Sequence, residues 1–157
     1  MAAGDVTFFN SFVLAVGNKE HDLNSDDWRI GLVTNATVPA KTTAAPCWGA
    51  GGTTNFSTNQ IATGTSYTGP IVMTSETWAT SSNSQVWSAG KIGPIAQDAG
   101  GATNIAYGII YNNTNANKEC AAFVEISSTG AVSLVSGPLE IRWNSVDGTG
   151  EIGSFDN

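Results

Sequence analysis

The hydrophobic residues of this chain follow one period before residue 27 and another period after it. In the first segment, Phe9, Val13 and Val16 recur at the i, i+4 and i+7 spacing of one helix face. Gly17 then stands where glycine commonly follows the last turn of a helix. The pattern predicts a short N-terminal helix, with a strand as the alternative because Phe and Val also favour strands.

Beyond residue 27 the helical period disappears, and short β-type segments follow one another. Trp28, Ile30 and Leu32 alternate with other residues at the period of a strand. Glycine, proline, asparagine or serine separates most of the later segments, as in chains that turn between strands. The pattern predicts strands at residues 28–34, 70–74, 76–80, 85–89, 104–111, 119–127, 131–135 and 138–144.

This spacing, about ten residues from one strand to the next, is typical of an antiparallel sandwich or barrel, and about eight strands also fit a jelly roll. We therefore expect an all-β fold. It would be an antiparallel β-sandwich or jelly roll of about eight strands with a short N-terminal helix. A chain of 157 residues fits a single domain, which we expect to span residues 1–157.

The run IAYGIIY, at residues 105–111, is apolar at alternate positions on both faces of the expected strand. A strand that is covered on both sides is central in its sheet or pressed against another segment. Gly108 in this run and Gly31 in the first strand leave room where a backbone or an aromatic ring approaches closely. Both runs are therefore expected to be architectural.

Residues 35–68 break the pattern, because glycine, proline and threonine are frequent there and the periodicity is weak. Loops of this length are uncommon in compact domains and are usually functional or bound to a partner. We expect a long loop excursion, with short strands near Gln60–Ile61 and Tyr67, that forms the main contact surface for another chain. A flexible insertion is the alternative.

Trp48 stands in the glycine-rich sequence PCWGAGG, where an aromatic ring is either tucked into the fold or offered to a partner. Aromatic anchors commonly dominate protein interfaces, so we predict Trp48 as the first partner-binding residue. The other predicted partner-binding residues are aromatic and lie in the N-terminal segment or the excursion: Phe8, Phe9, Phe56 and Tyr67.

Three further tryptophans, Trp78, Trp87 and Trp143, stand in contexts that fit inward-facing strand positions. Large aromatic side chains fill the core of a sandwich, so core packing is the favoured interpretation. The alternative is that tryptophans form stacking platforms for sugars, since five in a chain of this length are many.

The charge pattern excludes several classes of partner. Charged residues make up 12% of the chain, against roughly 25% in ordinary domains, so Ser, Thr, Asn and Gly must cover the surface. The net charge is −7 and the basic residues are scattered singly, which argues against nucleic-acid binding. No apolar run is long enough for a membrane helix, so we expect no membrane contact. Asp5 stands where a signal peptide needs basic residues, so we expect the chain to be made and left in a cytoplasm.

The sequence also lacks the usual signatures of catalysis. His21, the only histidine, stands in the polar link NKEHDLNSDD, which predicts a solvated side chain. No nucleophile elbow, phosphate loop or HExxH motif is present. Glu119 and Glu125 lie on the predicted strand 119–127 and Glu140 lies on the predicted strand 138–144, where a polar face explains them and nothing indicates a facing pair. We expect a non-enzymatic protein with no cofactor.

The link DLNSDD has the oxygen spacing that opens a calcium loop, at Asp22, Asn24 and Asp26. An EF-hand also needs Gly at the sixth position and Glu at the twelfth, and these are Asp27 and Val33 here. An EF-hand is therefore rejected. A turn in which Asp and Asn bond the backbone is favoured over a looser calcium site, so we expect no metal site.

The two cysteines, Cys47 and Cys120, lie far apart in the sequence. Without an export signal, two free thiols are expected, one in a loop and one in a strand; a disulfide is the alternative. Two cysteines without a patterned histidine do not make a zinc site.

Three stretches carry a resemblance to a known family: FFNSFVLAVGNKEHDLNSDDWRIGLVTN at the start, YGIIYNNT in the middle and LEIRWNSVDGTGEIGSF at the end. They combine a short helix, an HxLxSDxxxxxLxTN entry to the first strand and a closing strand with a glycine turn. In this pattern the chain resembles the small head decoration, or cement, proteins of tailed phages. The resemblance covers most of the chain and is weakest over residues 41–66.

The resemblance implies a virion structural protein that binds the outer surface of the assembled capsid and stabilises the head. Its partner would be the major capsid protein, and it would act as a homodimer or homotrimer. It would be made in the host cytoplasm and end on the capsid exterior. The folds known in the family are β-sandwiches or jelly rolls, and no shared active-site residues can be carried over to this chain.

Two other classes of function stay open. A tail or fibre module that binds host polysaccharide would use the tryptophans and the Ser/Thr/Asn surface. A calcium-dependent adhesin or lectin-like module would use Asp22, Asn24 and Asp26. An enzyme has the least support from the sequence.

Overall fold

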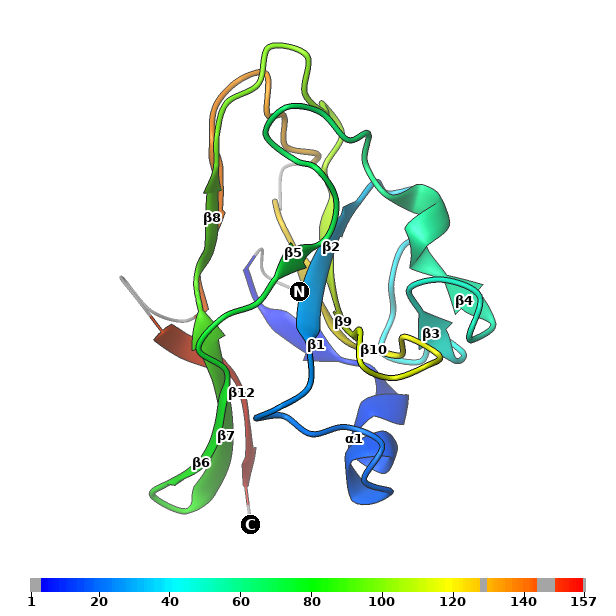
Figure 1. Ribbon diagram of the computed structural model, residues 1–157, viewed down its shortest axis with the longest axis vertical. Coiled ribbons are helices and arrows are strands. Elements are labelled where there is room, and N and C mark those ends of the chain that lie inside the picture. The colour runs from blue at the N-terminus through cyan, green and yellow to red at the C-terminus, as the bar shows by residue number, and fades with distance from the viewer. Residues whose placement is uncertain (1–3, 128–129, 144–148, 157) are drawn as a thin grey trace.

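The structure is a computed structural model that describes residues 4–127, 130–143 and 149–156, and it is mostly β (Figure 1). The elements in chain order are β1 (Val6–Phe8), α1 (Asn10–Gly17), β2 (Trp28–Val33), β3 (Pro46–Cys47), β4 (Thr54–Asn55), the 3-10 helix η1 (Phe56–Asn59), β5 (Ile71–Val72), β6 (Thr77–Ser81), β7 (Ser84–Gly90), β8 (Ile92–Ile95), β9 (Tyr107–Asn112), β10 (Cys120–Glu125), β11 (Leu139–Ile141) and β12 (Thr149–Asp156). None of the helices in these residues is long and apolar enough to cross a membrane.

Two larger sheets and two small strand pairs make up the fold. The five-stranded sheet has the order β1-β10-β9-β2-β5, and all of its neighbouring strands are antiparallel. The three-stranded sheet has the antiparallel order β12-β7-β6. β11 pairs with β8 antiparallel, and β3 pairs with β4 parallel. The predicted mostly β, mainly antiparallel fold with a short N-terminal helix is therefore confirmed.

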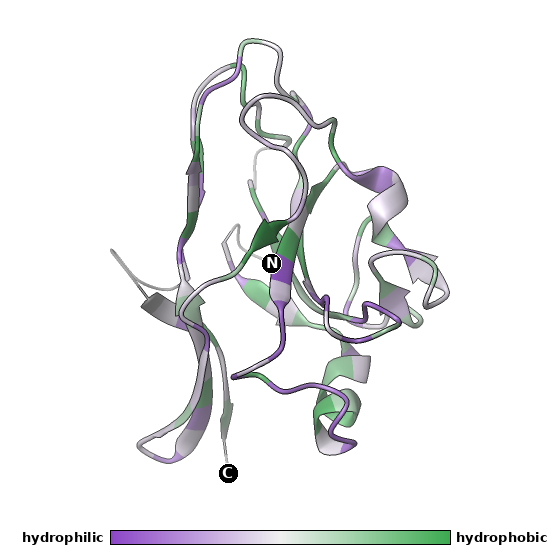
Figure 2. Ribbon diagram, viewed as in Figure 1, coloured by the Kyte–Doolittle hydropathy of each residue, from purple (hydrophilic) through white to green (hydrophobic). Residues whose placement is uncertain are grey.

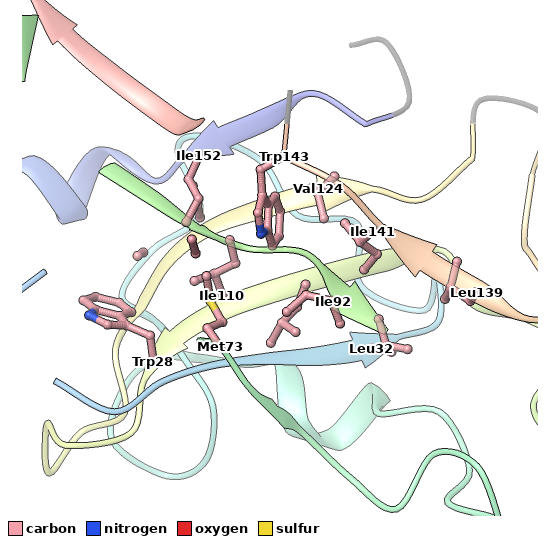
Figure 3. Close-up of a cluster of buried hydrophobic side chains, with 14 of the residues drawn as sticks. Trp28, Leu32, Met73, Ile92, Ile110, Val124, Leu139, Ile141, Trp143 and Ile152 are labelled. Atoms are coloured by element: carbon pink, nitrogen blue, oxygen red, sulfur yellow. The ribbon is translucent and has the colours of Figure 1, made fainter. Parts of the chain in front are cut away.

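The strand predicted to be central, at residues 104–111, is central. β9 lies between β10 and β2, and its side chains enter two hydrophobic clusters. The first cluster, called the main core, includes Trp28, Met73, Trp87, Ile110 and Trp143, and Figure 3 shows part of it. The second core consists of Phe9, Val33, Trp48, Phe56, Ile109, Tyr111, Cys120 and Phe123. Because both faces of β9 are buried, the run has no polar face.

Tryptophan side chains join the two larger sheets. The rings of Trp28 on β2 and Trp87 on β7 are fully buried, and their centroids lie 4.8 Å apart in an edge-to-face contact. Trp143, which follows β11, donates a 2.8 Å hydrogen bond from Nε1 to the carbonyl oxygen of Gly90. The prediction that Trp87 and Trp143 pack inside is confirmed.

Residues 35–68 are an integral part of the fold. They contain β3, β4 and η1, and they carry Trp48 and Phe56 into the second core. The Trp48 ring stacks on the Tyr111 ring with a centroid distance of 5.1 Å and an angle of 4°. The segment was expected to be a loop excursion with short strands near Gln60–Ile61 and Tyr67. It instead covers the second face of the five-stranded sheet, and only an isolated bridge from Gln60 to Val33 forms near those positions.

The helix forms where it was predicted, but its buried face differs. The buried residues of α1 are Phe12 and Ala15, whereas Val13 is 58% exposed. Of the predicted face of Phe9, Val13 and Val16, with Phe8 and Phe12 beside it, only Val13 is wrong, since Phe9 and Phe12 are buried and Phe8 and Val16 pack against the main core. The face is shifted because the chain up to Phe8 forms strand β1, and Phe9 is the extended residue before the helix. The helix is therefore oriented by Phe12, which enters the main core.

Other differences concern strands. Strands β1, β3, β4, β8 and β12 were not predicted, so the described residues contain more strands than the expected eight. β8 includes Gly93-Pro94, which reads as a turn, and β12 includes Gly150 and Gly153, which weaken a strand pattern. The predicted strand at 131–135 forms only a bridge between Ile105 and Val132. The glycine turn of the closing stretch LEIRWNSVDGTGEIGSF, in VDGTG at residues 146–150, falls partly on residues 144–148, outside the described residues.

Candidate interaction surface

Helix α1 presents apolar side chains to solvent. Val13 is 58% exposed and Leu14 is 67% exposed, and both belong to the large hydrophobic residues that the fold leaves uncovered. The helix sequence NSFVLAVG contains no charged residue. Phe9, which precedes α1, enters the second core, and Phe12 of α1 enters the main core. These two buried rings fix the orientation of the helix. Figure 2 shows the hydrophobic colouring of this exposed helix.

An apolar groove lies beside the exposed helix. It has a volume of about 190 Å³. Its lining residues are all apolar: Phe12, Val13, Val16, Leu23, Trp78 and Phe155. α1 forms one wall, and the strands β6 and β12 form the other, at the end of the molecule where Figure 1 places α1 and the β6–β7 hairpin. Together, the groove and the side chains of Val13 and Leu14 are called the α1 surface.

The wall opposite the helix is held by a contact between two rings. The Trp78 and Phe155 rings meet edge to face, with a centroid distance of 5.6 Å. The backbone N–H of Trp78 donates a 2.6 Å hydrogen bond to Oδ1 of Asn24, although β6 is an edge strand. Asn24 therefore occupies one backbone donor on the outer edge of β6, next to the groove.

The predicted partner-binding rings lie mostly inside the fold. The exposed fractions of Trp48, Phe9, Phe56 and Tyr67 are 6%, 0%, 0% and 2%. Of the two alternatives for Trp48, the structure has the ring tucked into the fold. Phe8 is half-buried, and its ring stacks on Phe12 at 5.0 Å, directly beneath the α1 surface. Phe8 therefore supports the α1 surface from inside, and a direct contact of any of the five rings with a partner stays a prediction.

Sequence reasoning missed Leu14, the most exposed of these apolar residues. The helical period assigned Val13 to the buried side and left Leu14 without a role. The available signal was that NSFVLAVG is apolar on more than one face, which is typical of a helix that is covered on several sides.

Trp78 is the most exposed of the five tryptophans. Its side chain is half-buried, whereas Trp28, Trp87 and Trp143 are at most 2% exposed. The expected inward-facing position of Trp78 is therefore only partly met, because β6 lies at the edge of the three-stranded sheet.

The expectation of a solvated His21 is wrong. The residue is 7% exposed, because the link of residues 18–27 folds back onto the end of β9. Nδ1 of His21 lies 3.0 Å from Nδ2 of Asn112, and the ring contacts Phe12 and Trp28 at centroid distances of 5.9 and 5.3 Å. Burial lowers the pKa of His21, and the nearby carboxylates of Glu119 and Asp26 oppose this shift.

The calcium-like spacing in DLNSDD forms a capped turn. Oδ1 of Asp22 accepts from the backbone N–H groups of Asn24 and Ser25, at 2.9 and 3.2 Å. Oδ2 of Asp26 accepts from the backbone N–H of Asp22 at 2.7 Å. These carboxylates satisfy backbone donors, as an Asx turn does. In the part of the chain that the structure describes, no group of three or more His, Cys, Asp or Glu could hold a metal ion.

The remaining reactive groups lie apart from the groove. Cys47 and Cys120 are free, as expected, but both lie in strands, since Cys47 is in β3 and not in a loop. Both are buried, and burial raises the pKa of Cys120 well above its ordinary value. Oε2 of Glu140 lies 3.0 Å from Nζ of Lys91, and Arg142 pairs with the same carboxylate. Glu119 lies near His21, with 3.7 Å between its Oε2 and the histidine Nε2.

Comparisons with known proteins add no relative to this description. A scan against protein-family models found no match, and neither a search of curated proteins nor a search of solved structures found one.

Proposed function

We propose that this chain is a non-enzymatic virion structural protein that binds the outer capsid surface and stabilises the assembled head. The α1 surface is the observation that carries the proposal. An exposed, uncharged helix beside an apolar groove has the character of an interface centre, where charged residues are depleted. The major capsid protein is the proposed partner, and the capsid exterior is the proposed location.

The physical basis of the proposed activity is mass action. A protein that binds the closed shell and not the free subunits adds its binding free energy to the shell alone. Each contact needs only the ordinary interface size, about 800 Å² per partner. Leu14 would insert into the capsid protein, and the groove would receive an apolar side chain in return. Many copies on one head would then stabilise it.

The proposal also includes the finer expectations about architecture. A β-sandwich or jelly roll is supported by the contact of Trp28 with Trp87, which packs the five-stranded sheet against the three-stranded one. A homodimer or homotrimer is part of the proposal as well, and sedimentation equilibrium of the purified protein would measure it.

Co-sedimentation with expanded, empty heads tests the proposed function. Leu14→Asp puts a charge at the most exposed apolar residue of the α1 surface, and Val38→Asp puts the same charge at a similarly exposed valine in the segment 35–68. We expect the wild type and Val38→Asp to sediment with the heads and Leu14→Asp to stay in the supernatant. Failure of the wild type to bind would refute capsid binding. Equal binding of all three proteins would refute the α1 surface as the contact.

The alternative is a tail or fibre module that binds host polysaccharide. The half-buried ring of Trp78, beside Phe155 in the groove, is the observation that favours it, because sugars stack on exposed aromatic rings. Glycan binding that is lost in Trp78→Ala, together with no binding to heads, would support this alternative. Trp48→Ala does not test it, since that ring is buried.

A further inference from the structure

The side chain of Asn112 is held in one orientation. Its Oδ1 accepts hydrogen bonds from the backbone N–H groups of Thr114 and Asn115, at 2.9 and 3.1 Å. The amide nitrogen Nδ2 therefore points the other way, where it donates to Oδ2 of Asp26 at 2.6 Å and lies 3.0 Å from Nδ1 of His21. Asn112 is fully buried, so these partners are the ones that satisfy it.

This orientation assigns the protonation state of His21. The amide Nδ2 is only a donor, so Nδ1 of His21 must accept its hydrogen bond. The proton of the neutral ring then sits on Nε2. That atom is buried and has no hydrogen-bond partner among the described residues, and it faces Oε2 of Glu119 at 3.7 Å.

A second proton on His21 would break this arrangement. It would sit on Nδ1 and point at the N–H group of Asn112, so that two donors would face each other. Rotation of the amide cannot relieve the conflict. It would turn Oδ1 toward the carboxylate of Asp26 and turn Nδ2 toward the two backbone N–H groups that Oδ1 now accepts.

The carboxylates around His21 favour its charged form and so raise its pKa. Glu20 and Asp26 come from the link, and Glu119 precedes β10. α1 contributes Phe12 and has no ionisable side chain, and β2 and β9 contribute Trp28 and Asn112, which do not ionise. Burial outweighs the carboxylates, so the pKa of His21 lies below its ordinary value of about 6.5. The folded protein therefore loses stability as the pH falls below about 6.5 toward the folded-state pKa.

We propose that His21 and Asn112 form a proton-operated latch beneath the α1 surface, which is closed when His21 is neutral. The ring of His21 stacks on Phe12 at 5.9 Å, and Phe12 both anchors α1 and lines the groove. Protonation releases Asn112, loosens the link of residues 18–27 and weakens partner binding at the α1 surface. The effect on partner binding rests on the function proposed above, whereas the latch itself does not.

NMR of the intact ¹⁵N-labelled protein tests the latch, since His21 is the only histidine of the chain. At pH 8 the ring nitrogen shifts are expected to show the proton on Nε2. On acidification the ring should become charged with a midpoint below 6.5, and the amide shifts of α1 should follow the same midpoint. A proton on Nδ1 at pH 8, a midpoint above 6.5 or α1 shifts that ignore the titration would overturn the latch.

Head binding at pH 8 and pH 5 tests the regulation, with His21→Gln as the variant that cannot titrate. We expect wild-type affinity to be severalfold lower at pH 5 than at pH 8, because the partner binds the form in which His21 is neutral and binding must then displace the proton. The affinity of His21→Gln for heads should be the same at pH 8 and pH 5. An equal fall in both proteins, or none in the wild type, overturns the regulation. If no protein binds heads at either pH, the proposed function fails, and the NMR titration still decides the latch.

Discussion

The indole ring of Trp48 occupies the space that a side chain at Gly31 would fill. A methyl group built at Gly31 would meet the six-membered ring of Trp48, which lies over β2 and stacks on Tyr111. The two residues come from different segments, since Gly31 is in β2 and Trp48 follows β3. Because Gly31 has no side chain, β2 leaves space for the Trp48 ring, which comes from the segment 35–68.

Gly31→Ala should destabilise the protein in a way that depends on Trp48. Forcing a methyl group into a packed core costs typically 1–3 kcal/mol, so we expect a loss of about that size in the free energy of unfolding. Trp48→Ala should cost about 3–5 kcal/mol by leaving a cavity. In the double variant the alanine at position 31 meets no indole, so it should add little. Chemical denaturation of the four proteins measures this coupling.

Gly137→Ala is the matched control, because no described atom lies within 4 Å of a methyl group built there. Its free energy of unfolding should change by only a few tenths of a kcal/mol. If Gly31→Ala lowers the free energy of unfolding equally with and without the indole of Trp48, then contact with that ring is not what requires glycine at position 31.

Tyr67→Phe should destabilise the fold through the backbone of β2. The hydroxyl oxygen of Tyr67 accepts a 3.1 Å hydrogen bond from the buried N–H of Leu32, and burial raises the pKa of Tyr67 to about 12. Loss of the acceptor leaves a buried donor unpaired, which costs about 1–3 kcal/mol. Urea denaturation measures the change, and Tyr107→Phe, at a half-buried tyrosine of β9, serves as the control. Equal effects of the two substitutions would show that the hydrogen bond to Leu32 does not account for the loss of stability.

Asp98→Asn should lower stability at neutral pH and have less effect in acid. The carboxylate accepts from the backbone N–H groups of Gly100, Thr65 and Ser66, and these bonds lower the pKa of Asp98. A carboxyl group with a lowered folded-state pKa stabilises the fold above its ordinary pKa, and this contribution is lost as the pH falls through the folded value.

Thermal melts of both proteins from pH 7 to pH 3 measure this difference in Tm. The gap between the wild type and Asp98→Asn should narrow below about pH 4. Glu76→Gln, which removes a carboxylate elsewhere in the chain, is the control for the loss of one negative charge. A gap for Asp98→Asn that stays constant down to pH 3 would contradict the role of the ionised carboxylate.

The two thiols should react only when the protein unfolds. Both cysteines are buried, Sγ of Cys47 donates to the carbonyl of Gly49 at 3.0 Å, and burial raises the pKa of Cys120. A thiol reagent attacks the exposed thiolate, so native protein should react far more slowly than denatured protein, which should show two thiols. Ser11→Cys, at an exposed position of α1, should add one fast-reacting thiol. Fast reaction of the native wild type would show that the second core opens readily.

Local patterns predicted the parts of the fold that depend on neighbours in sequence. The alternation around Trp28 identified β2, and the run at 105–111 identified β9 as a strand with two buried faces. The helix period located α1 but misplaced Val13, because the strand β1 ends at Phe8 and shifts the start of the helix. Glycine and proline hid β8 and β12, since these residues are also typical of turns.

The candidate site was less accessible to sequence reasoning. Leu14 was not identified because nothing in the helix itself shows which side the rest of the chain covers. His21 was assigned to solvent because its neighbours in sequence are polar, yet its hydrogen-bond partner Asn112 is 91 residues away.

The sequence by itself determined that the protein is built mainly from antiparallel strands. It also showed, through the glycine at position 31, that another group approaches the first strand closely there. Only the tertiary structure decided that the neighbour is Trp48, that His21 is buried and that α1 leaves Val13 and Leu14 uncovered. The physical reason is the distance along the sequence over which each effect acts. Strand period and turn chemistry act between adjacent residues, whereas burial and ring packing depend on which distant segments meet.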